Sequence, residues 1–233
     1  MCTNISTSAE VADDCMLGNN IVIEDGVSIG SGCVIGHGVV IHEGTQIGNN
    51  VQMEANCVIG RQPRSGINSA NQTTVQPPLF VGDDVVIGAC VVLYAGTTIE
   101  SQAMIGDHSS VRERCRIGQA AIVGRSVTIE CDSVIGARSK IQCACSITVG
   151  TIFEDEVFFG TQVCTTNDKY MGTAETVLRG PYIKKGAAIG ANATILPGVV
   201  VGENAIVGAG SVVTKEIPAG ATYIGVPARL IND

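Results

Sequence analysis

The sequence contains no tryptophan, and aromatic residues make up only 3% of its 233 positions. A compact core of this size usually relies on large aromatic side chains, so this interior must be filled by Val, Ile, Ala and Cys. Charged residues are also sparse, and the net charge of −8 disfavours nucleic acids and anionic membrane surfaces as partners. No run of 18 apolar residues and no secretory signal is present. We therefore expect a cytoplasmic protein without a membrane partner.

Ten cysteines are present, but no Cys-x-x-Cys pair occurs and only three histidines could complete a metal site. Four of the cysteines share one phase of the repeat described next: Cys33, Cys57, Cys115 and Cys145. We interpret most cysteines as small buried hydrophobic residues in a reducing compartment. No metal site is predicted.

An aliphatic or aromatic residue returns every six positions along most of the chain. The three runs extend from Leu17 to Ile59, from Val81 to Phe159 and from Ile183 to Val213. They comprise twenty-eight hexapeptides without one polar residue at the key position. Four positions later the residue is Ile, Val, Cys, Thr, Ala or Ser in all but one repeat. This period fits neither an α-helix nor a long strand.

Six residues provide one short strand and a turn, and three such units close a triangular coil of 18 residues. The aliphatic residues then point inward, and the small residues fill the crowded corners. Twenty-eight hexapeptides predict about nine coils, stacked over roughly 40 Å at the spacing of a parallel sheet. The sequence thus predicts one all-β domain over residues 1–233, a parallel β-helix.

Two interruptions of the repeat predict extruded loops, at residues 61–80 and 165–182. Proline, asparagine and serine are frequent in the first loop, whereas the second reads TTNDKYMGTAETVLRGPY. Both can be tolerated surface insertions, but we favour a functional role for the second. Residues 216–233 predict a cap over the open end of the last coil, which would otherwise expose sheet edges.

The stretch from Ile189 to Ile231, IGANATILPGVVVGENAIVGAGSVVTKEIPAGATYIGVPARLI, resembles acetyl-CoA-dependent sugar acetyltransferases of the left-handed β-helix superfamily. Within that superfamily, TTNDKY at 165–170 is similar to the active-site loop of enzymes that N-acetylate UDP- or dTDP-linked amino sugars. IGDHSSVRERCRIG at 105–118 resembles a coil with His and Arg-Glu in relatives of that group. The loop of the family often continues with proline, where this chain has Met171.

The resemblance implies a left-handed coil, a homotrimer, acetyl-CoA as acyl donor and a nucleotide-linked amino sugar of surface polysaccharide biosynthesis as acceptor. It further implies site residues of three kinds. The catalytic candidates are Asn167, Asp168 and His108, and the substrate-binding candidates are Arg112, Glu113, Lys169 and Tyr170. The CoA-binding candidates are Ala191 and Ala209, to which the positive charges near the C-terminus add Lys184, Lys185, Lys215 and Arg229.

Simple chemistry is consistent with these roles. Ala191 and Ala209 are 18 positions apart, so they stack, and their small side chains let a pantetheine arm approach the backbone. The basic residues near the C-terminus offer cations for the CoA phosphates, although a solvated cationic face is an equal alternative. Asn167 and Asp168 can position the amine, or they can simply form a turn. His108 lies three coils from the second loop, and Glu113 could orient it.

Other functions remain open at this stage. An O-acetyltransferase would need His108 as a base, because a hydroxyl group must lose its proton to attack. A metal-dependent γ-type carbonic anhydrase would need three convergent histidines, for which His37, His42 and His108 are poorly spaced. We expect His37 and His42 to be exposed turn residues. An ice-binding solenoid would need regular rows of threonine, and here the threonines are scattered.

Overall fold

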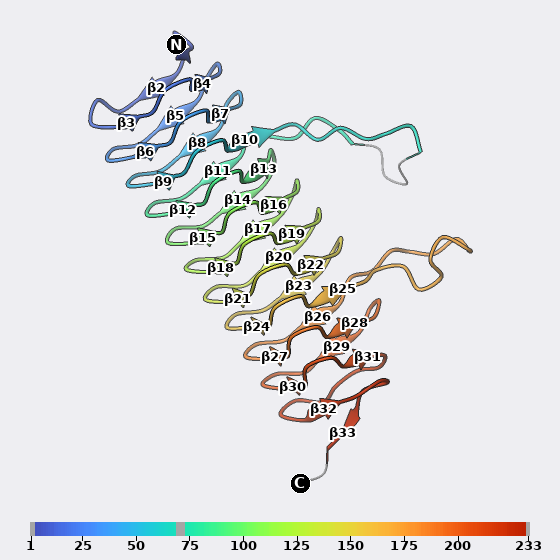
Figure 1. Cartoon of the computed structure of the whole chain (residues 1–233). Coiled ribbons are helices and arrows are strands. Elements are labelled where there is room, and N and C mark those ends of the chain that lie inside the picture. Colours follow the sequence, from blue (N-terminus) through green and yellow to red (C-terminus); the bar gives the residue numbers. More distant parts are fainter. Residues whose placement is uncertain (1–2, 69–72, 232–233) are drawn as a thin grey trace.

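The chain forms a β-helix of stacked triangular coils, seen in a computed structural model that describes residues 3–68 and 73–231 (Figure 1). The tip of the first predicted loop, 69–72, and the two ends of the chain, 1–2 and 232–233, lie outside the described residues. Three parallel sheets, here named A, B and C, form the three faces. None of the described residues forms a helix that could span a membrane.

The strands follow one another around the coil from sheet A to sheet B to sheet C. Sheet A comprises β1 (Asn4–Ile5), β4 (Val22–Ile23), β7 (Val40–Ile41), β10 (Val58–Arg61), β13 (Val92–Tyr94), β16 (Ser110–Val111), β19 (Thr128–Ile129), β22 (Ser146–Ile147), β25 (Cys164–Thr165), β28 (Thr194–Ile195) and β31 (Val212–Val213). Sheet B comprises β2 (Glu10–Val11), β5 (Ser28–Ile29), β8 (Gln46–Ile47), β11 (Phe80–Val81), β14 (Thr98–Ile99), β17 (Arg116–Ile117), β20 (Val134–Ile135), β23 (Ile152–Phe153), β26 (Tyr182–Ile183) and β29 (Val200–Val201). Sheet C comprises β3 (Met16–Leu17), β6 (Val34–Ile35), β9 (Gln52–Met53), β12 (Val86–Ile87), β15 (Met104–Ile105), β18 (Ile122–Val123), β21 (Lys140–Ile141), β24 (Phe158–Phe159), β27 (Ala188–Ile189), β30 (Ile206–Val207), β32 (Thr222–Ile224) and β33 (Arg229–Leu230).

The predicted all-β hexapeptide coil is confirmed. Residues 18 positions apart pair in parallel, as Val22 does with Val40 and Ile23 with Ile41. The aliphatic residue of each hexapeptide points inward, and the small residue four positions later is also buried in most coils, as Cys33 and Val39 illustrate. The interior is therefore mainly a column of Ile and Val side chains. It also holds two aromatic rings, because Phe153 and Phe159 are fully buried with their ring centres 4.4 Å apart.

The predicted number of about nine coils is too low, since sheet A alone has 11 strands. The missing coils lie at the two ends. Ile5 and Val11 continue the six-residue phase and pair with Ile23 and Ile29. At the other end, β32 pairs with β30, 16 residues back in sequence rather than 18, and β33 then turns antiparallel across β32. The shortened spacing removes that last coil from the hexapeptide pattern.

Sharp corners connect the sheets, and one residue at most corners has a positive φ angle, recurring every six positions. This left-handed conformation is cheap for glycine and tolerated by asparagine and aspartate. Gly26, Asn50 and Asp84 hold such positions, and so does His108 with a φ of 58°. We name the three rows of corners the A–B, B–C and C–A edges, after the sheets that each connects.

Candidate functional site

Both long loops leave the coil at the A–B edge (Figure 1). The first loop (residues 62–79) connects β10 with β11, and the second loop (residues 166–181) connects β25 with β26. They lie five coils apart in sheet A, or about 24 Å at the strand spacing of a sheet. The A–B edge therefore carries both long loops, and functional residues concentrate on loops held by a rigid scaffold.

The second loop has a closed neck and a folded tip. The Arg179 amide donates to the Asn167 carbonyl (3.0 Å), and the Thr166 amide donates to the Ile195 carbonyl (3.0 Å). The side-chain amide of Asn167 is half-buried and has no hydrogen-bond partner among the described residues. The neck thus holds one unused amide group beside the coil.

Asp168 organises the tip of the second loop. Its carboxylate accepts the backbone amides of Tyr170 (2.8 Å), Met171 (2.9 Å) and Gly172 (2.7 Å). These hydrogen bonds, that of Tyr170 first, lower the pKa of the Asp168 carboxyl below its usual value. The group is an anion at neutral pH, and it is fixed in place. Lys169 and Tyr170 lie next to it, with the ammonium nitrogen 5.7 Å from the centre of the ring.

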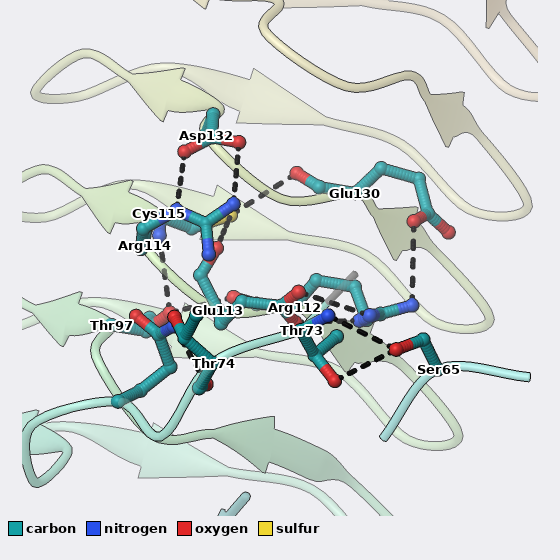
Figure 2. Close-up of polar contacts among 11 residues, drawn as sticks. Ser65, Thr73, Thr74, Thr97, Arg112, Glu113, Arg114, Cys115, Glu130 and Asp132 are labelled. Carbon is teal, nitrogen blue, oxygen red and sulfur yellow. Dashed lines mark hydrogen bonds and ion pairs between the residues drawn. The ribbon is translucent and has the colours of Figure 1, made fainter. Parts of the chain in front are cut away.

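Arg112 and Glu113 lie on the same A–B edge, three coils before the second loop. Glu113 is only 2% exposed, and both of its carboxylate oxygens accept from Arg112, at 2.8 and 3.0 Å (Figure 2). Arg112 also approaches Glu130 (3.7 Å) and lies 4.9 Å from the centre of the Tyr94 ring. A buried carboxylate of this kind is stabilised by its bidentate cation, so the pair is a rigid part of the edge.

His108 is separated from these groups. It is an exposed corner residue of the C–A edge, beside an open hollow of about 440 Å³ that Arg125 and Cys143 also line. Glu113 therefore does not orient it, because the carboxylate of Glu113 lies on another edge and is bound by Arg112. Along the axis of the coil, His108 lies three coils from the second loop, as expected. Around the coil, the two are on opposite sides of sheet A within one chain.

The candidate CoA-binding residues are distributed over the last coils. Ala191 and Ala209 stack on the C–A edge, where the Gly210 amide donates to the Ala191 carbonyl (2.8 Å). Lys184 and Lys185 lie on the B–C edge, Lys215 follows β31, and Arg229 belongs to β33. The stacked alanines and the second loop thus border sheet A on opposite sides.

The three histidines do not converge within the chain. His37 and His108 share the C–A edge but lie three coils apart, and His42 lies on the A–B edge. Within residues 3–68 and 73–231, no three His, Cys, Asp or Glu side chains gather closely enough to hold a metal ion. The zinc arrangement that a carbonic anhydrase needs is not formed by these histidines in one chain.

One pair on the A–B edge was missed from the sequence. His42 was expected to be an exposed turn residue, yet it is half-buried and its Nδ1 lies 3.1 Å from the carboxylate of Glu24. The signal was available, because the two residues are 18 positions apart, which is the length of one coil. The same spacing brings Arg114 to Asp132 and Arg138 to Glu156.

Comparison with protein families identifies the repeat units. Residues 8–43 and 180–215 match the family described as bacterial transferase hexapeptide (six repeats). Residues 26–61 match the hexapeptide repeat of succinyl-transferase. The sequence comparison with curated proteins gives no significant match. The family matches cover the repeat itself and leave the loops unassigned.

Solved structures resemble the chain to different degrees. The Arabidopsis UDP-N-acetylglucosamine acyltransferase is 16% identical with a TM-score of 0.59, and the match covers 98% of this chain and 73% of that one. The soybean serine acetyltransferase is 31% identical over 50% of this chain and 40% of that one, with a TM-score of 0.34. A perosamine N-acetyltransferase mutant from Caulobacter crescentus, in complex with CoA and GDP-perosamine, is 18% identical with a TM-score of 0.24, covering 99% and 57%. Of these three, the first similarity supports the architecture, and none assigns a substrate.

Proposed function

We propose that the protein transfers an acetyl group from acetyl-CoA to the amino group of a UDP- or dTDP-linked amino sugar. The observation that carries this proposal is the second loop. It presents an unpartnered side-chain amide, Asn167, next to a fixed carboxylate anion, Asp168, on an otherwise regular coil. The hexapeptide family and the acyltransferases that share the fold support acyl transfer as the reaction class.

The chemistry follows from the nature of the nucleophile. An amine on a sugar ring is less basic than that of lysine, so a useful fraction is neutral near pH 7 to 8 and needs no base to start the attack. Its lone pair must be directed at the thioester carbon. In this proposal the free lone pairs of the Asp168 carboxylate accept an N–H of the amine and fix that direction. Asn167 donates its amide N–H to a carbonyl of the ligand.

The bonds then change in a simple order. The amine nitrogen bonds to the thioester carbon, and the carbonyl oxygen of the tetrahedral intermediate carries the negative charge. Donors placed at that oxygen lower the barrier. The intermediate collapses, the carbon–sulfur bond breaks and the thiolate of CoA leaves. The proton released by the nitrogen balances the charge on the departing sulfur.

The stacked backbone at Ala191 and Ala209 is the proposed track for the pantetheine arm. Lys184, Lys185, Lys215 and Arg229 are the proposed partners of the CoA phosphates. Arg112, Glu113, Lys169 and Tyr170 are the proposed contacts of the nucleotide sugar. Because the alanines and the second loop border sheet A on opposite sides, we propose that the track of one chain meets the second loop of a neighbouring chain in a homotrimer.

A set of point variants tests the assignment of the second loop. Asn167→Ala and Asp168→Asn are each expected to lower kcat about 10²- to 10³-fold, the cost of losing a positioning group or an oxyanion donor. His108→Ala is expected to act chiefly on KM. Glu175→Ala, an exposed position on the same loop, serves as the control and should leave both constants unchanged.

Release of CoA thiol from acetyl-CoA, measured over a panel of dTDP- and UDP-linked sugars, provides the readout. The amino sugars should react and the matched hydroxyl sugars should not. If His108→Ala alone abolishes kcat while both loop variants remain near wild type, a general base carries the reaction. That outcome, together with turnover of the hydroxyl sugars, would establish an O-acetyltransferase instead.

A further inference from the structure

A pocket of about 690 Å³ opens beneath the first loop, on the A–B edge. Its lining includes Glu24, His42, Arg61, Arg64 and Gln76. Pockets of roughly 300–1,000 Å³ are typical of small-molecule sites. The pocket lies six coils from the neck of the second loop, or about 29 Å along the edge, so it is separate from the proposed transfer site in the same chain.

The backbone that forms this pocket is tightly determined. Gly60 has a φ of 80°, and a β-carbon on it would overlap the Thr45 hydroxyl. Only glycine therefore fits at this position, where the chain leaves the coil above the corner that contains His42. A β-carbon on Gly44 would lie 2.8 Å from the Pro78 ring, where the loop returns. The first loop therefore packs closely on this corner at both of its ends.

Side-chain hydrogen bonds join the two arms of the first loop. The Gln62 amide group donates to the Gln76 carbonyl and accepts the Gln76 amide, both at 2.9 Å. Farther out, the Ser65 hydroxyl accepts the Thr73 amide at 3.0 Å (Figure 2). The arms form a fixed wall beside the pocket.

The polar groups of the floor are also fixed. The carboxylate of Glu24 lies 3.1 Å from Nδ1 of His42 and accepts the Glu43 amide at 3.1 Å. The other ring nitrogen of His42, Nε2, has no partner among the described residues, and 29% of the side chain is exposed. A carboxylate that holds one imidazole nitrogen fixes the orientation of the ring and leaves the other nitrogen able to bind a ligand.

Two cations complete the pocket. Arg61 and Arg64 form no ion pair within the part of the chain that the structure describes, although Arg61 lies 5.6 Å from the centre of the Tyr94 ring. Unpaired guanidinium groups favour phosphate, which they bind with two parallel hydrogen bonds. Glu24 and Glu43 line the same space and would repel an isolated anion, but they accept hydrogen bonds from hydroxyl groups.

We infer that the pocket beneath the first loop binds a sugar phosphate. The phosphate pairs with Arg61 and Arg64, and the hydroxyl groups of the sugar meet Glu24, Glu43 and Nε2 of His42. This site goes beyond the proposed acetyl transfer, and it does not depend on it. The same chemistry explains why cations and carboxylates share one small pocket on an acidic protein.

Isothermal titration calorimetry on the full chain tests the inference with glucose 1-phosphate, glucose and inorganic phosphate as probes. We expect glucose 1-phosphate to bind once per chain, at least tenfold more tightly than either of the other two. Arg64→Ala should weaken binding at least tenfold, and His42→Gln several-fold. Lys140→Ala, which removes one positive charge from β21, is the matched control and should bind like wild type. Circular dichroism verifies that each variant is folded.

The inference is overturned if glucose 1-phosphate shows no binding at millimolar concentration, or if Arg64→Ala binds it like wild type. Equal affinity for glucose 1-phosphate and inorganic phosphate would also overturn it, because the carboxylates and His42 would then make no contribution to binding of the sugar hydroxyl groups. No acyl transfer is measured in this experiment. Failure of the sugar phosphate to bind is therefore distinguishable from failure of the proposed acetyltransferase activity.

Discussion

At the scale of single residues, the corners explain why cysteine, serine and threonine share one position. The side chain four places after the inward aliphatic residue is buried beside a carbonyl 15 residues ahead. Ser109 donates its hydroxyl to the Gly124 carbonyl (2.8 Å), and Cys115 donates its thiol to the Glu130 carbonyl (3.1 Å). A small donor therefore fits the position, and alanine or valine fits when no donor is present.

Burial of these thiols predicts a loss of stability at alkaline pH. It raises the pKa of Cys57 and Cys145 to about 11 and that of Cys115 to about 12, above the ordinary value of 9.0. Below pH 9 both folded and unfolded thiols are protonated. Above it the unfolded chain loses protons that the folded chain keeps, so the free energy of unfolding falls as pH rises.

Urea unfolding at pH 8 and pH 10.5 measures this effect. The wild-type midpoint should fall more between the two pH values than that of the Cys57→Ala, Cys115→Ala, Cys145→Ala triple variant. Alanine is acceptable there, because Ala103 and Ala121 hold the same position in other coils. Cys143 is a control, because its thiol is partly exposed and its pKa is lowered, chiefly by a backbone hydrogen bond from Arg125. The midpoint of the Cys143→Ala variant should fall between the two pH values by at least as much as that of the wild type. Equal falls for wild type and triple variant would contradict the explanation.

At the scale of elements, the two loops are insertions of different length at the same edge. Val58 of β10 pairs with Val92, which places 16 extra residues in that coil beyond the usual 18. Cys164 of β25 pairs with Thr194, which places 12 extra residues there, the length of two hexapeptides. The coils on either side keep their register, so each loop is a local addition to the solenoid.

The second loop can therefore be removed without a change of phase. Deletion of residues 168–179 leaves Thr166, Asn167, Gly180, Pro181 and Tyr182 between Thr165 and Ile183, which is one hexapeptide. We expect a folded protein with a cooperative thermal transition by circular dichroism, and thiol release at least 100-fold slower than wild type. A deletion variant that still transfers acetyl groups would remove the second loop from the mechanism.

Prediction from sequence succeeds where the period constrains the chain. The inward positions of the repeat, such as Ile23 and Ile105, follow from six-residue spacing alone and are fully buried. The last coil was not predicted, because Tyr223 lies 16 residues, not 18, after its partner Val207. The sequence also did not predict that His108 and Glu113 are separated. They are five positions apart in sequence, but strand β16 lies between them, so they belong to different edges of the coil. Contacts between neighbouring coils can be predicted by comparing residues 18 positions apart, and this comparison identifies the pair of His42 and Glu24.

At the scale of the whole molecule, the stack of coils leaves three long faces, and the outward positions of sheet C are the most apolar. From β12 to β30 they read Val86, Met104, Ile122, Lys140, Phe158, Ala188 and Ile206. Met104 is 45% exposed, Phe158 is 40% exposed and Ile206 is 49% exposed. An apolar stripe of this kind, interrupted only by Lys140, is unfavourable in water, and a second copy of the chain is the partner that we expect to cover it.

The proposed homotrimer predicts that sedimentation gives about three times the chain mass of 24.0 kDa. Phe158→Glu places a charge in the stripe and is expected to shift the protein toward smaller species, whereas Ser28→Glu, on the outward side of sheet B, should not. Dissociation should also slow acetyl transfer, because in the proposed homotrimer the track at Ala191 and Ala209 of one chain meets the second loop of a neighbouring chain. A 24.0 kDa monomer that turns over substrate at the wild-type rate would refute both the trimer and the shared site.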